Sequence, residues 1–190
     1  MNHYYENIFG WFDEGDKKLY DRVVELYQNG DIFVEIGSFK GRSSSIMGVN
    51  IINSQKDIKF YCVDTWMGSI EHQKDGLAED EHVVNGELYE EFLKNTVPVK
   101  DVISIIRKPS VEAANDFEDN SLSFVFIDAS HDYESVKNDI NAWYPKMKSG
   151  GTLAGHDWNF PPVMQAVKEF AEANNFNIQS GGCWEIIITK

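Results

Sequence analysis

The chain has 190 residues, of which 42% are hydrophobic and 13% aromatic, so it can bury one substantial core, and we expect a single domain over residues 1–190. Its 31 acidic and 17 basic side chains give a net charge of −14, which disfavours nucleic acid and anionic membrane surfaces as partners. The N-terminal residues contain no basic segment that leads into a long apolar stretch, and no window is long enough to span a membrane, so we expect a cytoplasmic protein.

Helix and strand patterns alternate along the chain. Residues 1–30 contain a helical pattern that ends at an Asn-Gly pair, and the aromatic residues of this segment could fold over a site or form a homodimer contact. Four apolar runs follow, with the composition of buried parallel strands: IFVEIG, IKFYCVD, VISII and LSFVFID. Helical patterns follow the first run at 44–52 and the fourth at 133–143. This alternation predicts an α/β fold in which helices cover both faces of the sheet, a three-layer α/β/α sandwich.

The C-terminal part adds a fifth strand and a hairpin. A Gly-Gly turn leads into the fifth strand, which ends at His156 and Asp157, and a helical pattern follows it. The runs FNIQS and WEIIIT come next, and the Gly-Gly link between them is so short that the two strands must be antiparallel. We therefore expect a mostly parallel sheet that closes with a C-terminal antiparallel hairpin.

The longest polar interval, residues 67–96, is acidic and lies just beyond the second predicted strand. An insertion at the carboxyl edge of a parallel sheet is well placed to cover a ligand, so we expect this stretch to cover the substrate. Its charge favours a cationic or neutral polar substrate over an anionic one. His72 and His82 lie within it, in segments without a convincing motif.

The stretch DIFVEIGSFKGRSSSIM places Glu35 at the end of the first strand and two glycines, Gly37 and Gly41, in the turn that follows. A glycine turn at this point usually receives a pyrophosphate, as in the G-x-G-x-x-G motif, but a carboxylate would repel that group. It would attract the ammonium of an amino-acid-bearing nucleoside such as S-adenosylmethionine. Asp64, which ends the second strand, is placed to accept hydrogen bonds from ribose hydroxyls, a role that NAD-binding proteins share. The alternatives are an ordinary tight turn for the glycines and a helix cap for Asp64.

Four motifs in a fixed order carry a family resemblance: VEIGSFKGRSS, YCVDTW, FVFIDASHDYESVKNDI and GGTLAGHDW. Together they resemble class I S-adenosylmethionine-dependent methyltransferases, in particular the group of macrocin O-methyltransferase-like and cephalosporin-hydroxylase-like sequences. The resemblance runs from about Asp31 to the C-terminus. It implies a Rossmann-like sheet of seven strands, with the cofactor across the ends of the first two. It also implies methyl transfer to a small-molecule acceptor that is held above the fourth and fifth strands.

The resemblance also implies which residues bind the cofactor. Those predicted to face its methionine half are Glu35, Gly37, Ser38, Gly41 and Ser43, and Asp64 is predicted to bind the ribose. Trp66 and Ser110 are predicted to contact the adenine, Ser110 on spacing alone, and Asp128 could orient the cofactor amine.

A second predicted site lies at the ends of the fourth and fifth strands. Asp128 and Asp157 should meet there, because neighbouring parallel strands end at the same edge of a sheet. Two carboxylates could hold a divalent cation, as Mg²⁺ is held in enzymes that resemble catechol O-methyltransferase. Those enzymes usually have an acidic residue where this chain has His156, a ligand that suits Mn²⁺, Zn²⁺ or Fe²⁺ better than Mg²⁺. The predicted metal set is Asp128, His156 and Asp157, with Mg²⁺ or Mn²⁺ as the ion.

Without a metal, His131 or His156 could act as general base on the acceptor hydroxyl, so the predicted catalytic residues are Asp128, His131, His156 and Asp157. His131 could instead cap the following helix. Two other function classes stay open: an NAD-dependent oxidoreductase, which Glu35 and the absent G-x-G-x-x-G motif argue against, and a non-catalytic cofactor-binding relative.

Overall fold

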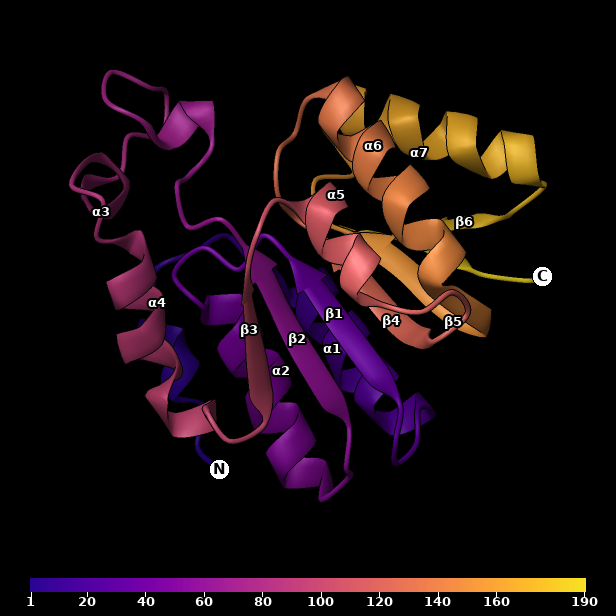
Figure 1. Ribbon diagram of the computed structural model, residues 1–190, viewed down its shortest axis with the longest axis horizontal. Coiled ribbons are helices and arrows are strands. Elements are labelled where there is room, and N and C mark those ends of the chain that lie inside the picture. Colours follow the sequence, from indigo (N-terminus) through magenta and orange to yellow (C-terminus); the bar gives the residue numbers. More distant parts are fainter.

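A computed structural model describes residues 1–190 and contains one seven-stranded sheet (Figure 1). Its strands are β1 (Ile32–Ile36), β2 (Lys59–Asp64), β3 (Ile103–Arg107), β4 (Leu122–Ile127), β5 (Met147–Gly155), β6 (Ile178–Ser180) and β7 (Trp184–Ile187). Their order across the sheet is β3-β2-β1-β4-β5-β7-β6. The first five strands are parallel, and β7 runs antiparallel to both β5 and β6. The predicted mixed sheet with its C-terminal hairpin is confirmed.

Helices cover both faces of this sheet, as Figure 1 shows. They are α1 (Glu14–Leu26), α2 (Arg42–Ser54), α3 (Glu81–Val84), α4 (Leu88–Thr96), α5 (Ser110–Ala113), α6 (Tyr133–Trp143) and α7 (Pro161–Asn174). One buried cluster joins α1, α2 and α4 to one face of the strands, and a second joins α5, α6 and α7 to the other face. No helix is both long and apolar enough to cross a membrane.

The alternation of side chains along the strands explains why there are two cores. In β1, Phe33 belongs to the first cluster and Val34 to the second, and in β4 the same is true of Phe124 and Val125. Successive residues of a strand point to opposite faces, so a strand that is apolar throughout needs cover on both sides. The continuous apolar runs of the sequence therefore dictate the three layers.

Local signals fix where the helices next to the sheet edge begin. The side chain of Asp13 accepts hydrogen bonds from the backbone N–H groups of Gly15 and Asp16, and the Asp16 side chain accepts one from the Asp13 N–H. These bonds form a capping box at the start of α1. Asp132 caps α6 by accepting a hydrogen bond from the Ser135 N–H at 3.0 Å. The helix cap is therefore Asp132 and not His131, which leaves the imidazole free for other contacts.

The insertion 67–96 divides into two parts. Leu88 and Phe92 of α4 are buried in the first core, so the end of the insertion belongs to the helical layer. Residues 69–78 instead line a cavity at the carboxyl edge of the sheet. That the insertion covers a substrate stays a prediction, but this earlier part is placed to do so.

Candidate active site

Two adjoining cavities lie at the carboxyl edge of the sheet. The larger has a volume of about 730 Å³ and is lined by the N-terminal segment, the glycine turn, residues 69–78 and the residues that follow β4 and β5. The smaller has a volume of about 340 Å³ and lies beside Asp64 and Ser110. Gly37, Phe39 and Asp128 line both cavities, so they form one continuous hollow in which a ligand could extend from one side to the other.

The turn between β1 and α2 requires its glycines. Gly37 has a φ of +89°, and a Cβ at this position would lie 1.9 Å from the backbone oxygen of Asp128. Gly41 has a φ of +84° and is the N-cap of α2, where it supplies no capping side chain. The first N–H groups of α2 therefore stay available to a ligand, as is usual where a helix begins at a cofactor site.

Glu35 is fully buried beneath this turn and lines neither cavity. Its carboxylate accepts hydrogen bonds from the hydroxyls of Tyr20 at 3.0 Å and Ser38 at 2.8 Å, and also from Ser44. Burial raises its pKa, and the hydroxyl donors oppose that shift. The structure thus places Glu35 among partners of its own chain, and its predicted pairing with a cofactor ammonium stays a prediction.

Asp64 lines the smaller cavity, and its carboxylate also holds the glycine turn in place. One of its oxygens accepts hydrogen bonds from the backbone N–H groups of Ser38 and Phe39, both at 2.9 Å, and the other accepts one from the Trp66 N–H at 2.7 Å. Burial raises the pKa of Asp64, although these hydrogen bonds act to lower it. The oxygen that accepts only the Trp66 bond can still accept a further one, so a ribose remains compatible with this position.

The other residues predicted to bind the cofactor fall into two groups. Ser38 and Ser43 line the larger cavity, and Ser110 lines the smaller one, where its Oγ accepts a hydrogen bond from Trp143 Nε1 at 2.9 Å. Trp66 lines neither cavity, because its ring packs against Tyr89 and Phe92 in the core. A wall for adenine at Trp66 therefore has no support in this geometry.

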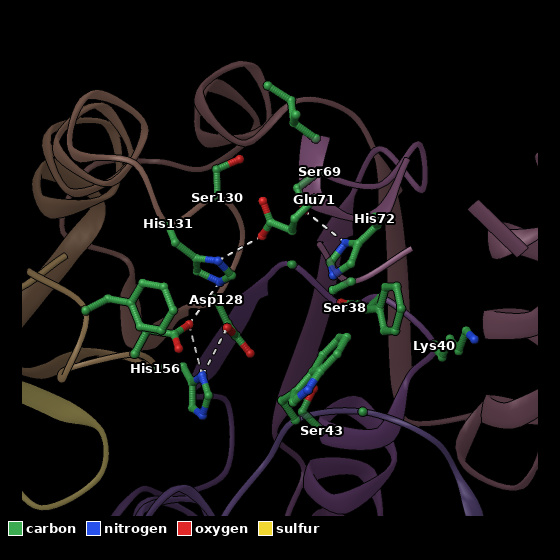
Figure 2. Close-up of a pocket in the computed structure, with 18 of the residues that line it drawn as sticks. Ser38, Lys40, Ser43, Ser69, Glu71, His72, Asp128, Ser130, His131 and His156 are labelled. Carbon is green, nitrogen blue, oxygen red and sulfur yellow. Dashed lines mark hydrogen bonds and ion pairs between the residues drawn. The ribbon is translucent and has the colours of Figure 1, made fainter. Parts of the chain in front are cut away.

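Acidic and histidine side chains alternate at the ends of β4 and β5 (Figure 2). His131 lies between two carboxylates, with its Nδ1 3.0 Å from Glu71 Oε1 and its Nε2 2.9 Å from Asp157 Oδ2. His156 Nδ1 lies 3.1 Å from the same Asp157 oxygen and 3.6 Å from Asp128 Oδ1. The structure thus brings together all four predicted catalytic residues.

Burial and neighbouring charges together shift the pKa values of these four groups, upward for Asp128 and the two histidines and downward for Asp157. Burial raises the pKa of Asp128 well above its usual value, although the neighbouring His156 acts to lower it. The hydrogen bond to Asp157 raises the pKa of His131 to about 8. Burial acts to lower the pKa of His156, but hydrogen bonds to Asp157 and Asp16 raise it to about 11. Burial also acts to raise the pKa of Asp157, and the two histidines outweigh it and hold this pKa below its usual value. Both imidazoles lie next to carboxylates, which favour their protonated forms.

Three of these side chains could share one cation. Asp128, His131 and Asp157 can each offer a ligand atom, and these atoms all lie within 4.8 Å of one another. The predicted ligand His156 is not part of this group, because its Nε2 lies 3.3 Å from Asp16 and its Nδ1 faces Asp157. In this arrangement His131 stands where the sequence analysis places His156.

Sequence reasoning missed three residues of this region. Glu71 comes from the insertion and Asp16 from α1, and neither follows a strand of the sheet, so no spacing signal connects them to the site. Asp16 is fully buried, and its Oδ1 has no hydrogen-bond partner. Arg42 lines the larger cavity, donates a hydrogen bond to the Gly10 oxygen at 2.9 Å and has no acidic partner. The position of Arg42 directly after Gly41 could have predicted its place, because a residue in the first turn of α2 lies at the edge of the sheet where the cofactor is expected.

Known proteins resemble this chain in sequence and in fold. The model of the family described as "Methyltransferase domain" matches residues 34–158. An uncharacterized protein of Sinorhizobium fredii (strain NBRC 101917 / NGR234) is 27% identical over 126 residues, which cover 65% of this chain but only 13% of that protein. An uncharacterized protein of Acanthamoeba polyphaga mimivirus is 27% identical over 188 residues, which cover 93% of this chain and 74% of that protein.

Among solved structures, the O-methyltransferase NovP superposes with a TM-score of 0.69 at 20% identity, and the match covers 92% of this chain and 81% of NovP. At this identity the similarity demonstrates a shared fold.

Proposed function

Because the chain belongs to the methyltransferase family whose model matches residues 34–158, it is an S-adenosylmethionine-dependent methyltransferase, and we propose that it methylates a hydroxyl group of a small-molecule acceptor. The observation that carries this proposal is the group of Asp128, His131, His156 and Asp157 beside the glycine turn, in a cavity of about 730 Å³. A hydroxyl must lose its proton during methyl transfer, and this group can accept one. The fold shared with NovP, which is an O-methyltransferase, supports the same reaction class.

The two adjoining cavities fit the cofactor. S-adenosylmethionine, when bound, supplies the methyl group from its sulfonium and leaves as S-adenosylhomocysteine. The open start of α2 suits the methionine end, and Arg42 adds an unpaired cation there for its carboxylate. Asp64 and Ser110 line the smaller cavity, which suits the ribose and adenine.

Asp128 is the residue best placed to take the proton of the acceptor. It is the one acidic side chain that lines both cavities, so it lies where the methyl donor and the acceptor would meet. Burial raises its pKa, which makes the carboxylate a stronger base, whereas His131 and His156 lie beside carboxylates that favour their protonated forms. In this proposal the two histidines fix Asp157 and balance part of the negative charge.

A metal-assisted variant uses the same residues. Asp128, His131 and Asp157 would hold a divalent cation that lowers the pKa of the acceptor hydroxyl. A donor set of two carboxylates and one imidazole favours Mn²⁺ over Mg²⁺, because Mg²⁺ prefers oxygen ligands alone. Glu71 would then orient His131 through its Nδ1, as carboxylates orient many metal-bound histidines.

Calorimetric titration with S-adenosylhomocysteine and, separately, with NAD tests the cofactor assignment. We expect S-adenosylhomocysteine to bind and NAD not to bind, and binding of NAD alone would overturn the proposal in favour of an oxidoreductase. Transfer of a labelled methyl group to a panel of alcohols and phenols then tests the reaction. Cofactor binding without transfer to any hydroxyl compound would favour a non-catalytic relative.

The same assay in chelator decides between the two variants of the mechanism. Loss of transfer in chelator, with recovery on addition of Mn²⁺, would support the metal. Full activity in chelator would leave Asp128 as the base without a metal.

Whether the chain forms a homodimer stays a prediction. The N-terminal segment, which could form that contact, lines the larger cavity.

A further inference from the structure

One part of the wall of the larger cavity is apolar, although most of the lining residues are polar or charged. Phe9 and Trp11 of the N-terminal segment are 57% and 51% exposed, and Ile70 and Leu77 of the insertion are 89% and 103% exposed. Phe160, next to the start of α7, is 52% exposed and lines the same cavity. Exposed apolar side chains from three separate segments that converge on one hollow mark a ligand-binding surface.

Much of this wall is aromatic, and its rings contact one another. Trp11 stacks on His72 with ring centroids 5.4 Å apart and an angle of 15° between the planes. Phe39 lies 5.6 Å from Trp11 and 5.0 Å from His72, and Phe9 meets Trp11 edge to face at 5.1 Å. Phe9 and Trp11, the outer rings of this cluster, remain exposed, so an aromatic ring of a ligand could pack against them.

The wall leads to the proposed reaction centre. Phe160 lies 5.7 Å from the His131 ring, which is itself in contact with Asp157. A ligand that rests against the aromatic side chains could therefore point one end at the acid–histidine group.

Most acidic side chains of the insertion lie outside the larger cavity, and Glu71 is the one that lines it. Glu79, Asp80, Glu81 and Glu91 line a separate hollow with His82. Lys40 forms a buried ion pair with Asp80 at 2.5 Å, so its charge is already compensated. That this charge selects a cationic or polar acceptor stays a prediction, since most of these acidic groups lie away from the aromatic part of the cavity wall.

The geometry points to a neutral phenol as the acceptor, with its ring against Trp11, Phe39 and His72 and its hydroxyl toward Asp128. This inference rests on the proposed function and narrows it to one acceptor class. A sugar would place several hydroxyl groups against apolar side chains that cannot bond them, whereas a phenol places its ring there and one polar group at the polar end. The larger cavity would hold the methionine end of the cofactor as well as the acceptor, and its total volume of about 730 Å³ lies within the usual range of small-molecule sites, roughly 300–1,000 Å³.

Binding to the protein saturated with S-adenosylhomocysteine tests the inference without requiring turnover. The probes are two neutral phenols, catechol and 2-naphthol, and a neutral sugar, methyl α-D-glucopyranoside, each titrated by calorimetry. We expect the phenols to bind and the sugar not to bind. Binding of the sugar alone, or of none of the three while S-adenosylhomocysteine still binds, would overturn the phenol assignment and leave the methyltransferase proposal intact.

Substitutions of Trp11 locate the bound ring. Trp11→Ala should weaken phenol binding about tenfold, because it removes the exposed face of the aromatic cluster, and Trp11→Phe should restore most of the affinity. Affinity for S-adenosylhomocysteine should change less than twofold. Leu26→Ala, at a residue that is 53% exposed and outside the cavity, is the matched control. Equal phenol affinity in Trp11→Ala and the wild type would refute the proposed position.

Discussion

The carboxylates that end β1 and β2 and those that follow β4 and β5 lie at the same edge of one sheet, yet their surroundings differ. Glu35 accepts hydrogen bonds from three hydroxyls of its own chain, and Asp64 accepts three from backbone N–H groups. Asp128 and Asp157 accept none from hydroxyls or backbone, and they face histidines and the cavity instead.

In the proposed function, this difference separates carboxylates that hold the scaffold from those that react. Hydrogen bonds from fixed donors stabilise a buried carboxylate and make it part of the scaffold. A carboxylate that faces titratable groups and a cavity can exchange a proton or bind a cation. All four are carboxylates at or near the carboxyl end of a strand, and the supply of local donors distinguishes the two pairs.

The largest expected effect is on turnover. Asp128→Asn should lower kcat by about 100-fold or more, because it removes the proposed base from the point where the two cavities meet. The melting temperature should stay the same or rise, since burial already disfavours the charge. Initial rates at saturating substrates and thermal unfolding measure the two effects. Asp119→Asn, at an exposed carboxylate paired with Lys146, is the control, and an unchanged rate in Asp128→Asn would exclude Asp128 as the base.

The next effect is on stability and concerns Glu35, one of the two carboxylates that accept hydrogen bonds from fixed donors. Glu35→Ala should lower the free energy of unfolding by about 2–4 kcal/mol, because buried hydroxyls lose their acceptor and a cavity opens. Urea unfolding measures this loss. Glu35→Gln keeps one acceptor oxygen and should cost less. If either variant kept its stability but lost affinity for S-adenosylhomocysteine, Glu35 would belong with the reactive carboxylates and the comparison would fail.

The third effect is a pH dependence of stability to which His131 contributes. The pKa of His131 is raised from 6.5 to about 8 by Asp157, so this ion pair stabilises the fold fully below pH 6.5 and is lost as the pH rises through 8. The expected loss is about 2 kcal/mol at most. Unfolding in chelator between pH 6 and 9 measures it. His131→Gln should reduce the loss of stability across this range, and the slope from His156 should remain, because its pKa is also raised from 6.5, to about 11. An unchanged profile in this variant would show that His131 does not contribute.

The smallest effect tests whether the insertion contributes to the reactive group. Glu71→Gln should lower kcat about three- to tenfold with little change in the KM for S-adenosylmethionine, because it weakens the contact that positions His131 without touching the glycine turn. Steady-state rates measure both constants. Glu90→Gln, on α4 of the same insertion, is the matched control. Equal rates in the two variants would show that the contact with His131 is not needed for turnover.

The sequence by itself determined the architecture and the location of the site. Apolar runs with helical patterns between them require a sheet covered on both faces, and the bounds of α6 agree with the predicted 133–143. Because parallel strands end at one edge, residues that follow β4 and β5 had to meet, and the structure brings Asp128, His131, His156 and Asp157 together. These features depend on periodicity and on strand direction, which are local properties of the chain.

Only the tertiary structure decided what surrounds each of these residues. Asp16 reaches His156 from α1, and Glu71 reaches His131 from the insertion, although neither is near its partner in the sequence. Trp66 follows a strand-end acid but turns into the core. The partners of a side chain depend on how distant segments pack over the sheet edge, and periodicity carries no information about that packing, so the metal-compatible set and the aromatic wall could not be read from the sequence.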